Sequence, residues 1–178
     1  MTRTITGLAV ALLLSAGACG PDQPAVVHES SAPVHTFAGG CGGTVLTDSE
    51  PPVWAQGGWN VVKGQPWSVP WALGSGGQAV AFLFAIELVA GTSPRVDGTN
   101  NKVLWVAKGS PPNFAVAGTP MGATEPAVSV NGGPSIVDVP ASGCWTFRLS
   151  WGLDRSTGST INLDVLPAGS TPPVPAAA

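Results

Sequence analysis

Tyrosine is absent from this chain, and histidine, cysteine and charged residues are all scarce. Among 178 residues there are two histidines and three cysteines, and charged residues make up 10 % of the chain. Both histidines, His28 and His35, precede the stretch that is predicted to fold, so a nucleophile activated by histidine is not expected. The net charge of −3 and the lack of any lysine or arginine cluster exclude a nucleic-acid-binding protein. No cofactor is expected, because the glycine-rich stretch 74–77 lacks the lysine and the following helix of a phosphate-binding loop.

The N-terminus carries no apolar run long enough to span a bilayer. Its apolar run, residues 5–14, is too short for a permanent transmembrane helix, and residues 1–18 are typical of an export signal. Ala16 and Ala18 suit cleavage by signal peptidase. The same residues resemble a bacterial lipobox, with Ala16 at the position where leucine is most common. The resemblance implies that Cys19 is acylated on sulfur and becomes the mature N-terminus; the alternative is a secreted protein with an unused thiol.

Without Cys19, two cysteines remain in an exported chain, and an even pair predicts one disulfide, Cys41–Cys144. Such a bridge closes a loop of roughly 100 residues, worth up to ~4–5 kcal/mol in the chain-entropy model. In 144–151 the sequence alternates strictly between apolar and polar residues, as in a strand with one buried face. Cys144 falls on the polar phase, so we expect the bridge on the outer side of the fold.

Strand patterns dominate the rest of the chain. Residues 79–89 are the strongest candidate, with β-branched and aromatic residues and flanking glycines. Further short strands are predicted at these positions: 44–46, 102–108, 114–117, 127–130, 136–139, 144–151 and 160–166. Two Trp- and Pro-rich pieces, 59–62 and 67–73, are predicted to be extended and edge-like. Together they predict an all-β fold, an antiparallel β-sandwich of about seven or eight strands.

The segment that leads into 144–151 resembles the late-strand pattern of immunoglobulin-like domains. There a small-residue turn and a glycine, here 140–143, are followed by an aromatic residue, here Trp145. Those domains usually have tyrosine at this position. An indole can only donate a hydrogen bond, so any corner bond made by Trp145 must run from its ring N–H.

Composition divides the chain into four parts. Residues 1–18 form the predicted lipoprotein signal peptide, and 19–40 a polar, disordered tether in which His28 and His35 are solvated. Residues 41–167 form the β-sandwich. The Pro- and Ala-rich end, 168–178, is predicted to be a disordered tail.

The acidic residues are scattered, and most are predicted at turns or on the wet phase of strands. A secreted hydrolase that uses a carboxylate pair or a loop-bound metal is therefore kept only as an alternative function. The candidate acids are Asp48, Glu50, Glu87, Asp97, Glu125, Asp138, Asp154 and Asp164. The loop 97–101 offers several oxygens but does not fit a calcium loop, and its residues also suit a hairpin turn, so no metal site is assigned.

The seven tryptophans are the one unusual feature of the composition that could form a binding surface. Trp105, Trp145 and Trp151 fall in predicted strands and are assigned to the core. Four others lie in Pro- and Gly-rich segments: Trp54, Trp59, Trp67 and Trp71. These four either fill one end of a small sandwich or form an exposed surface that stacks on sugar rings or anchors a protein partner. Their burial distinguishes the two interpretations.

The chain also resembles a group of small bacterial lipoproteins, from actinobacteria, that are uncharacterised. The resemblance is carried by the lipobox-like Cys19, by 69–73 (VPWAL), by 101–106 (NKVLWV), and by 134–140 (PSIVDVP) leading to 143–145 (GCW). It implies an exported, immunoglobulin-like β domain and supplies no catalytic residues. We therefore predict a non-enzymatic binding or structural module, anchored in the cell membrane by an N-terminal lipid and facing outward, with a protein or polysaccharide partner in the cell envelope. A carbohydrate-binding module is a second alternative.

Overall fold

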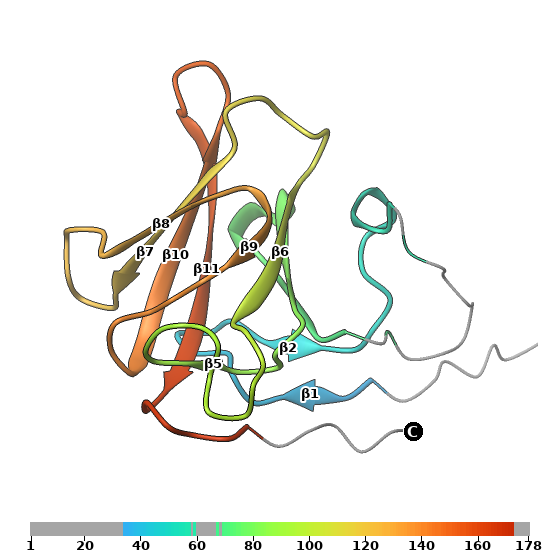
Figure 1. Ribbon diagram of the computed structural model, residues 1–178. Coiled ribbons are helices and arrows are strands. Elements are labelled where there is room, and N and C mark those ends of the chain that lie inside the picture. The colour runs from blue at the N-terminus through green and yellow to red at the C-terminus, as the bar shows by residue number, and fades with distance from the viewer. Residues whose placement is uncertain (1–33, 58, 60–66, 68, 173–178) are drawn as a thin grey trace, which may run out of the picture. The chain divides into compact units, whose positions relative to one another are not determined.

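The computed structural model describes residues 34–57, 59, 67 and 69–172, and these residues form two β-sheets. Sheet A has the order β1-β2-β3-β4-β6-β9, and sheet B has the order β5-β11-β10-β7-β8. In Figure 1 the strands β7, β10 and β11 lie in one layer and β6 and β9 in the other. The predicted all-β sandwich is therefore confirmed, although the described residues form eleven strands rather than seven or eight.

The strands of sheet A are short, and most follow one another in the chain. They are β1 (Thr36–Phe37), β2 (Leu46–Thr47), β3 (Trp71–Leu73), β4 (Ala79–Leu83), β6 (Lys102–Ala107) and β9 (Gly133–Ile136). All neighbouring pairs in this sheet are antiparallel. Two 3-10 turns, η1 (Val53–Ala55) and η2 (Ser75–Gly77), flank β3.

Sheet B is built around the longest hairpin of the protein. Its strands are β5 (Leu88–Val89), β7 (Ala115–Pro120), β8 (Val128–Asn131), β10 (Gly143–Trp151) and β11 (Thr157–Leu166). β10 pairs with β11 on one side and with β7 on the other, both antiparallel. β5 pairs with the end of β11 in parallel, so the sandwich is not antiparallel throughout.

The main core lies between the inner faces of the two sheets. The alternation predicted for 144–151 is confirmed, because Trp145, Phe147, Leu149 and Trp151 on β10 are all buried. Ile161, Leu163 and Val165 on β11 meet them from the next strand. Burying one large apolar side chain contributes about 1.5–3 kcal/mol, so this hairpin supplies much of the driving force for folding.

The corner before β10 is held by an indole. The Nε1 atom of Trp145 donates a hydrogen bond to the carbonyl oxygen of Ala141 at 2.9 Å. Trp145 is 1 % exposed, so its ring fills the core while its one polar atom is paired. The expected corner bond, in which the indole N–H of Trp145 is the donor, is thus present.

The predicted disulfide between Cys41 and Cys144 is present. The Cα atoms of the two cysteines are 5.9 Å apart. Both cysteines are half-buried, and Cys144 shares the outer phase of β10 with Thr146 and Arg148. Neither cysteine belongs to the core between the sheets. The expectation that the bridge lies on the outer side of the sandwich is therefore confirmed.

The single strand predicted at 79–89 is wrong. β4 ends at Leu83 in sheet A, and β5 begins at Leu88 in sheet B, so the chain changes sheets between them. Ile86 has a φ of 62°, a left-handed conformation that a β-branched residue rarely adopts. The alternation of apolar residues continues through the turn at 84–87, because the residues before and after it are buried. The turn contains neither glycine nor proline, so the sequence does not show where β4 ends.

The predicted tether, 19–40, extends too far. Its last residues are part of the fold: β1 pairs with β2, and Gly40 forms an isolated bridge with Leu163. The side chain of His35 is 58 % exposed, as expected for a solvated residue, but His35 is held to the fold: its backbone N–H donates to the buried Asp48 carboxylate at 2.8 Å, and its Nδ1 contacts that carboxylate at 2.7 Å. The signal peptide, Cys19, His28, residues 60–62 of one expected extended piece and the end of the tail lie outside the described residues.

Candidate functional site

A second, smaller apolar cluster lies on the outer face of sheet A. Trp67 and Trp71 are 8 % and 6 % exposed, and they pack with Ala55 of η1 against Val80 and Phe82. The Nε1 atom of Trp71 donates to the carbonyl oxygen of Ser49 at 2.7 Å. Two of the four candidate tryptophans are therefore buried, and they cover a sheet face that would otherwise expose Val80 and Phe82 to water.

The other two candidates, Trp54 and Trp59, are half-buried at the border of this cluster. The ring centroid of Trp59 lies 5.3 Å from that of Trp67, 5.2 Å from that of Phe82 and 5.9 Å from that of Phe84. Phe84 remains 43 % exposed, and the Lys102 ammonium lies 4.8 Å from its ring centroid. The structure thus leaves a border of two tryptophans and one phenylalanine accessible, not a platform of four indoles.

Two of the candidate acids, Asp48 and Glu87, are buried. Asp48 is 5 % exposed and holds His35, as described above. Glu87 is 6 % exposed, and burial, followed by the nearby Asp164 carboxylate, raises the pKa of Glu87 above its usual value. The carboxylate of Asp164 therefore lies close enough to that of Glu87 for the two candidate acids to interact.

Three of the other candidate acids, Asp97, Asp138 and Asp154, accept hydrogen bonds from neighbouring residues. Asp97 accepts from the Arg95 guanidinium at 2.6 Å and from Thr99 at 2.7 and 3.0 Å, and these hydrogen bonds hold the pKa of Asp97 well below its usual range. Asp138 accepts from Ser93, and Asp154 from Ser156. Within the described ranges, no three His, Cys, Asp or Glu side chains gather as metal ligands.

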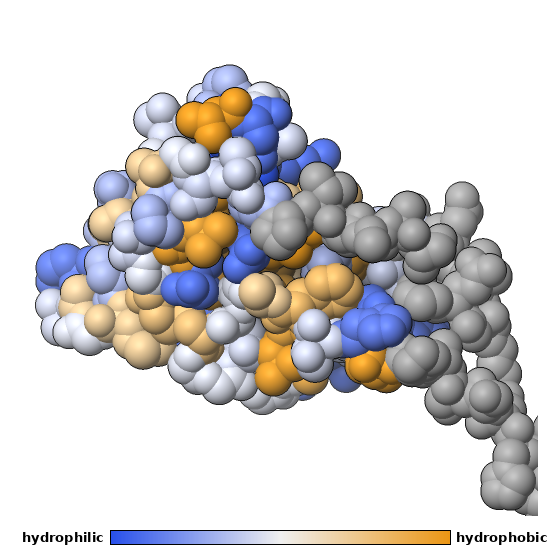
Figure 2. Space-filling model, turned by 90° about the horizontal axis from the view of Figure 1, so that it is seen from below, coloured by the Kyte–Doolittle hydropathy of each residue, from blue (hydrophilic) through white to orange (hydrophobic). Residues whose placement is uncertain are grey.

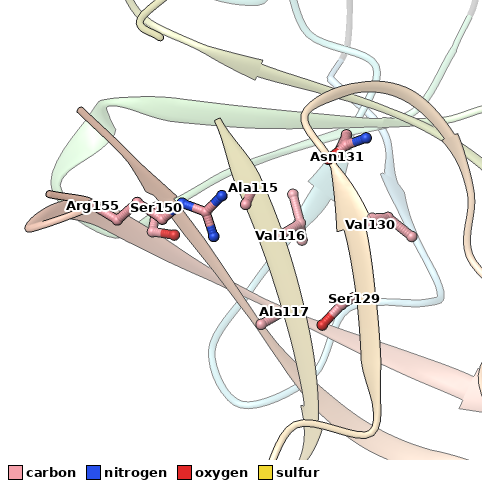
Figure 3. Close-up of a pocket in the computed structure, with 8 residues that line it drawn as sticks. All are labelled: Ala115, Val116, Ala117, Ser129, Val130, Asn131, Ser150 and Arg155. Carbon is pink, nitrogen blue, oxygen red and sulfur yellow. The ribbon is translucent and has the colours of Figure 1, made fainter. Parts of the chain in front are cut away.

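A shallow groove of about 280 Å³ runs over β7 on sheet B (Figure 3). Arg155 and Ser150 lie near Ala115 at one end, and Ala117 and Ser129 lie at the other. The groove is lined by Ala115, Val116, Ala117, Ser129, Val130, Asn131, Ser150 and Arg155. Its lining includes no carboxylate, thiol or imidazole, so the groove holds no general base beside its two serines.

One buried polar residue was interpreted from the sequence as part of a turn. Asn101 is 0 % exposed, and its side-chain amide bonds both the N–H and the C=O of Val89, at 3.0 and 2.7 Å. Its backbone carbonyl accepts from the N–H of Val137 at 2.9 Å. Asn101 therefore joins β5 to the start of β6. The sequence did not reveal this role, because the pair Asn100–Asn101 is also typical of a turn.

The described surface is mixed in character. On the face shown in Figure 2, apolar residues lie in separate groups among polar ones. In the described part of the chain, no helix combines the length and the apolar character that crossing a bilayer requires. Comparisons with protein-family models, with curated proteins and with solved structures find no match.

Proposed function

We propose that this protein is an exported lipoprotein whose β-sandwich is a non-catalytic interaction module at the outer side of the cell membrane. The observation that carries the proposal is the disulfide pairing of the cysteines. Three cysteines are present, and the fold uses Cys41 and Cys144 for its disulfide. Cys19 therefore has no part in that bridge, and it follows directly on the small residues of a lipobox-like signal.

The length of chain after Cys19 fits this arrangement. Fourteen residues separate Cys19 from Val34, the first residue that the structure describes. At ~3.3–3.6 Å per residue these cannot reach farther than about 50 Å. An acylated Cys19 keeps the module close to the membrane, where it meets partners in the envelope, whether a protein or a polysaccharide.

Detergent phase partitioning of the chain expressed in an actinobacterial host tests the anchor. The wild-type protein is expected in the detergent phase and the Cys19→Ala variant in the aqueous phase, with mass spectrometry showing acyl groups on wild-type Cys19 alone. Identical partitioning of the two chains contradicts the proposal. Capture of partners from solubilised membranes by the wild-type chain, together with binding to a polysaccharide array, then distinguishes a protein partner from a glycan.

A further inference from the structure

The outer face of β6 carries an unusual row of side chains. Lys102, Leu104 and Val106 follow one another at every second position, so they share one face, and Lys108 comes directly after the strand. The opposite phase, with Val103 and Trp105, is buried in the core. Both lysines are exposed, and the two aliphatic residues between them are half-buried.

The neighbouring strand extends this row sideways. Ile136 of β9 pairs with Lys102, and Pro134 pairs with Leu104. Ile136 is 50 % exposed and Pro134 is also exposed. On the other side of the row, Phe84 lies beneath Lys102. No acidic residue occurs in β3, β4, β6 or β9, whereas Lys102 and Lys108 lie within β6 and directly after it; the exposed Asp138, two positions after Ile136, accepts from Ser93.

The aromatic cover of sheet A does not close this area. Trp67 and Ala55 bury Val80 and Phe82 over β4, but Ile136 remains half exposed and Leu104 and Val106 are only partly covered. We define the lysine–apolar patch as Phe84, Lys102, Leu104, Val106, Lys108, Pro134 and Ile136. It combines accessible aliphatic and aromatic carbon with two ammonium groups at its ends.

We propose that the lysine–apolar patch docks onto a lipid surface with anionic headgroups. Lysine is depleted from the cores of protein interfaces, whereas a lysine beside apolar side chains suits the boundary between headgroups and acyl chains. Each lysine near an anionic surface contributes about 1 kcal/mol, and Phe84 and Ile136 reach the same boundary. This inference rests on the proposed membrane anchoring and names the partner that the anchored module meets first.

Co-sedimentation of the exported Cys19→Ala chain with lipid vesicles tests the patch separately from the anchor. Vesicles of equal parts phosphatidylglycerol and phosphatidylcholine are compared with vesicles of phosphatidylcholine alone. The two lysines predict about 30-fold tighter partitioning to the anionic vesicles, which high salt reduces because exposed charges are screened. Equal partitioning to both vesicle types, or no binding to either, overturns the proposal.

Matched variants locate the contact. Lys102→Gln and Lys108→Gln are each expected to weaken partitioning about fivefold, whereas Arg148→Gln on the outer face of sheet B leaves it unchanged. Ile136→Ser is expected to weaken it several-fold, while Leu153→Ser does not, although Leu153 is 92 % exposed on the β10–β11 turn. Thermal unfolding confirms that each variant is folded. If the control variants lose as much binding as the patch variants, the patch is not the contact.

The two proposals fail in distinguishable ways. If wild type and Cys19→Ala partition identically in detergent while the Cys19→Ala chain still binds anionic vesicles, the anchor is wrong and the patch stands. If acylation of Cys19 is found but the unacylated chain ignores vesicles, the anchor stands and the patch is not a lipid contact.

Discussion

The side-chain amide of Asn101 makes two hydrogen bonds to one residue, accepting from the N–H of Val89 and donating to its C=O. A neighbouring strand would satisfy the same two groups. β5 is only two residues long and needs this help, because an unpaired buried N–H or C=O costs about 1–3 kcal/mol. One side chain thus completes the hydrogen bonding of Val89 where sheet B ends.

Replacement of Asn101 by alanine is expected to destabilise the protein by ~2–5 kcal/mol, because both backbone groups of Val89 lose a partner in a site without water access. Urea unfolding measures the change. Asn100→Ala, at the exposed neighbouring position, is the control and is expected to stay within about 0.5 kcal/mol of wild type. Similar losses in both variants would show that the amide of Asn101 is not what holds β5.

Removal of the disulfide by the double change Cys41→Ala and Cys144→Ala is expected to cost about 4–5 kcal/mol, because the bridge closes a long loop in the unfolded chain. The sequence separation of the two cysteines is 103. Denaturant unfolding under oxidising conditions measures it, and reduction of the wild-type chain should give the same loss. Cys19→Ala should leave the unfolding midpoint unchanged; a shift there would mean that Cys19 takes part in the fold.

Two core tryptophans differ in one hydrogen bond. Trp145 donates to Ala141, whereas the Nε1 atom of Trp105 is buried with no hydrogen-bond partner among the described residues. Each is 1 % exposed, so a change to phenylalanine removes similar ring volume from the core. Trp145→Phe is expected to be more destabilising than Trp105→Phe by ~1–3 kcal/mol, since only the first change loses a bond and the second removes an unpaired donor. Equal losses by urea unfolding would count against the corner bond.

Glu87 makes stability depend on pH. Its pKa in the folded protein lies above the ordinary value of 4.5, so the folded state holds the proton more tightly than the unfolded chain does. The corresponding stability is present below pH 4.5 and is lost as the pH rises through the higher, folded pKa. Glu87→Gln is therefore expected to be more stable than wild type at pH 7 and to approach it at low pH.

Urea unfolding of wild type and Glu87→Gln between pH 3 and pH 8 measures this difference, and Glu125→Gln on an exposed loop is the control. Asp97 acts in the opposite direction, because its lowered pKa contributes stability that is lost below its ordinary value of 3.8. It is common to both chains and cancels in the comparison. A difference that does not change with pH would contradict the assignment to Glu87.

The alternation of apolar and polar residues predicts a strand well when one face of the strand is buried and the other is in solvent. β10 was predicted almost residue for residue, because one face meets the core and the other meets solvent and the disulfide. The segment 79–89 was not, because every residue of β4 is buried, between the main core on one face and Trp67 and Trp71 on the other. Where both faces are buried, the pattern carries no mark of the sheet in which a residue lies.

The burial of the four candidate tryptophans and the pairing of the buried polar residues depend on contacts between residues that are distant in the sequence. Nothing near Trp67 or Trp71 in the sequence shows that they cover β4 while Trp54 and Trp59 stay half-exposed. The pairs His35–Asp48 and Asn101–Val89 join residues 13 and 12 positions apart, with no periodic signal to connect them. The cysteines were predictable, since their number alone allowed one pairing after Cys19 was set aside.

The position of the disulfide decides how the domain bears a load. Cys41 lies near the start of the fold, and Cys144 belongs to β10, which has strands on both sides. A pull on the N-terminus that peels β1 from β2 stops at the covalent bridge. The force then passes into β10 and is shared by its ladders with β7 and β11. A domain tethered at this end therefore resists extension through its most extensively paired strand, and not through its shortest one.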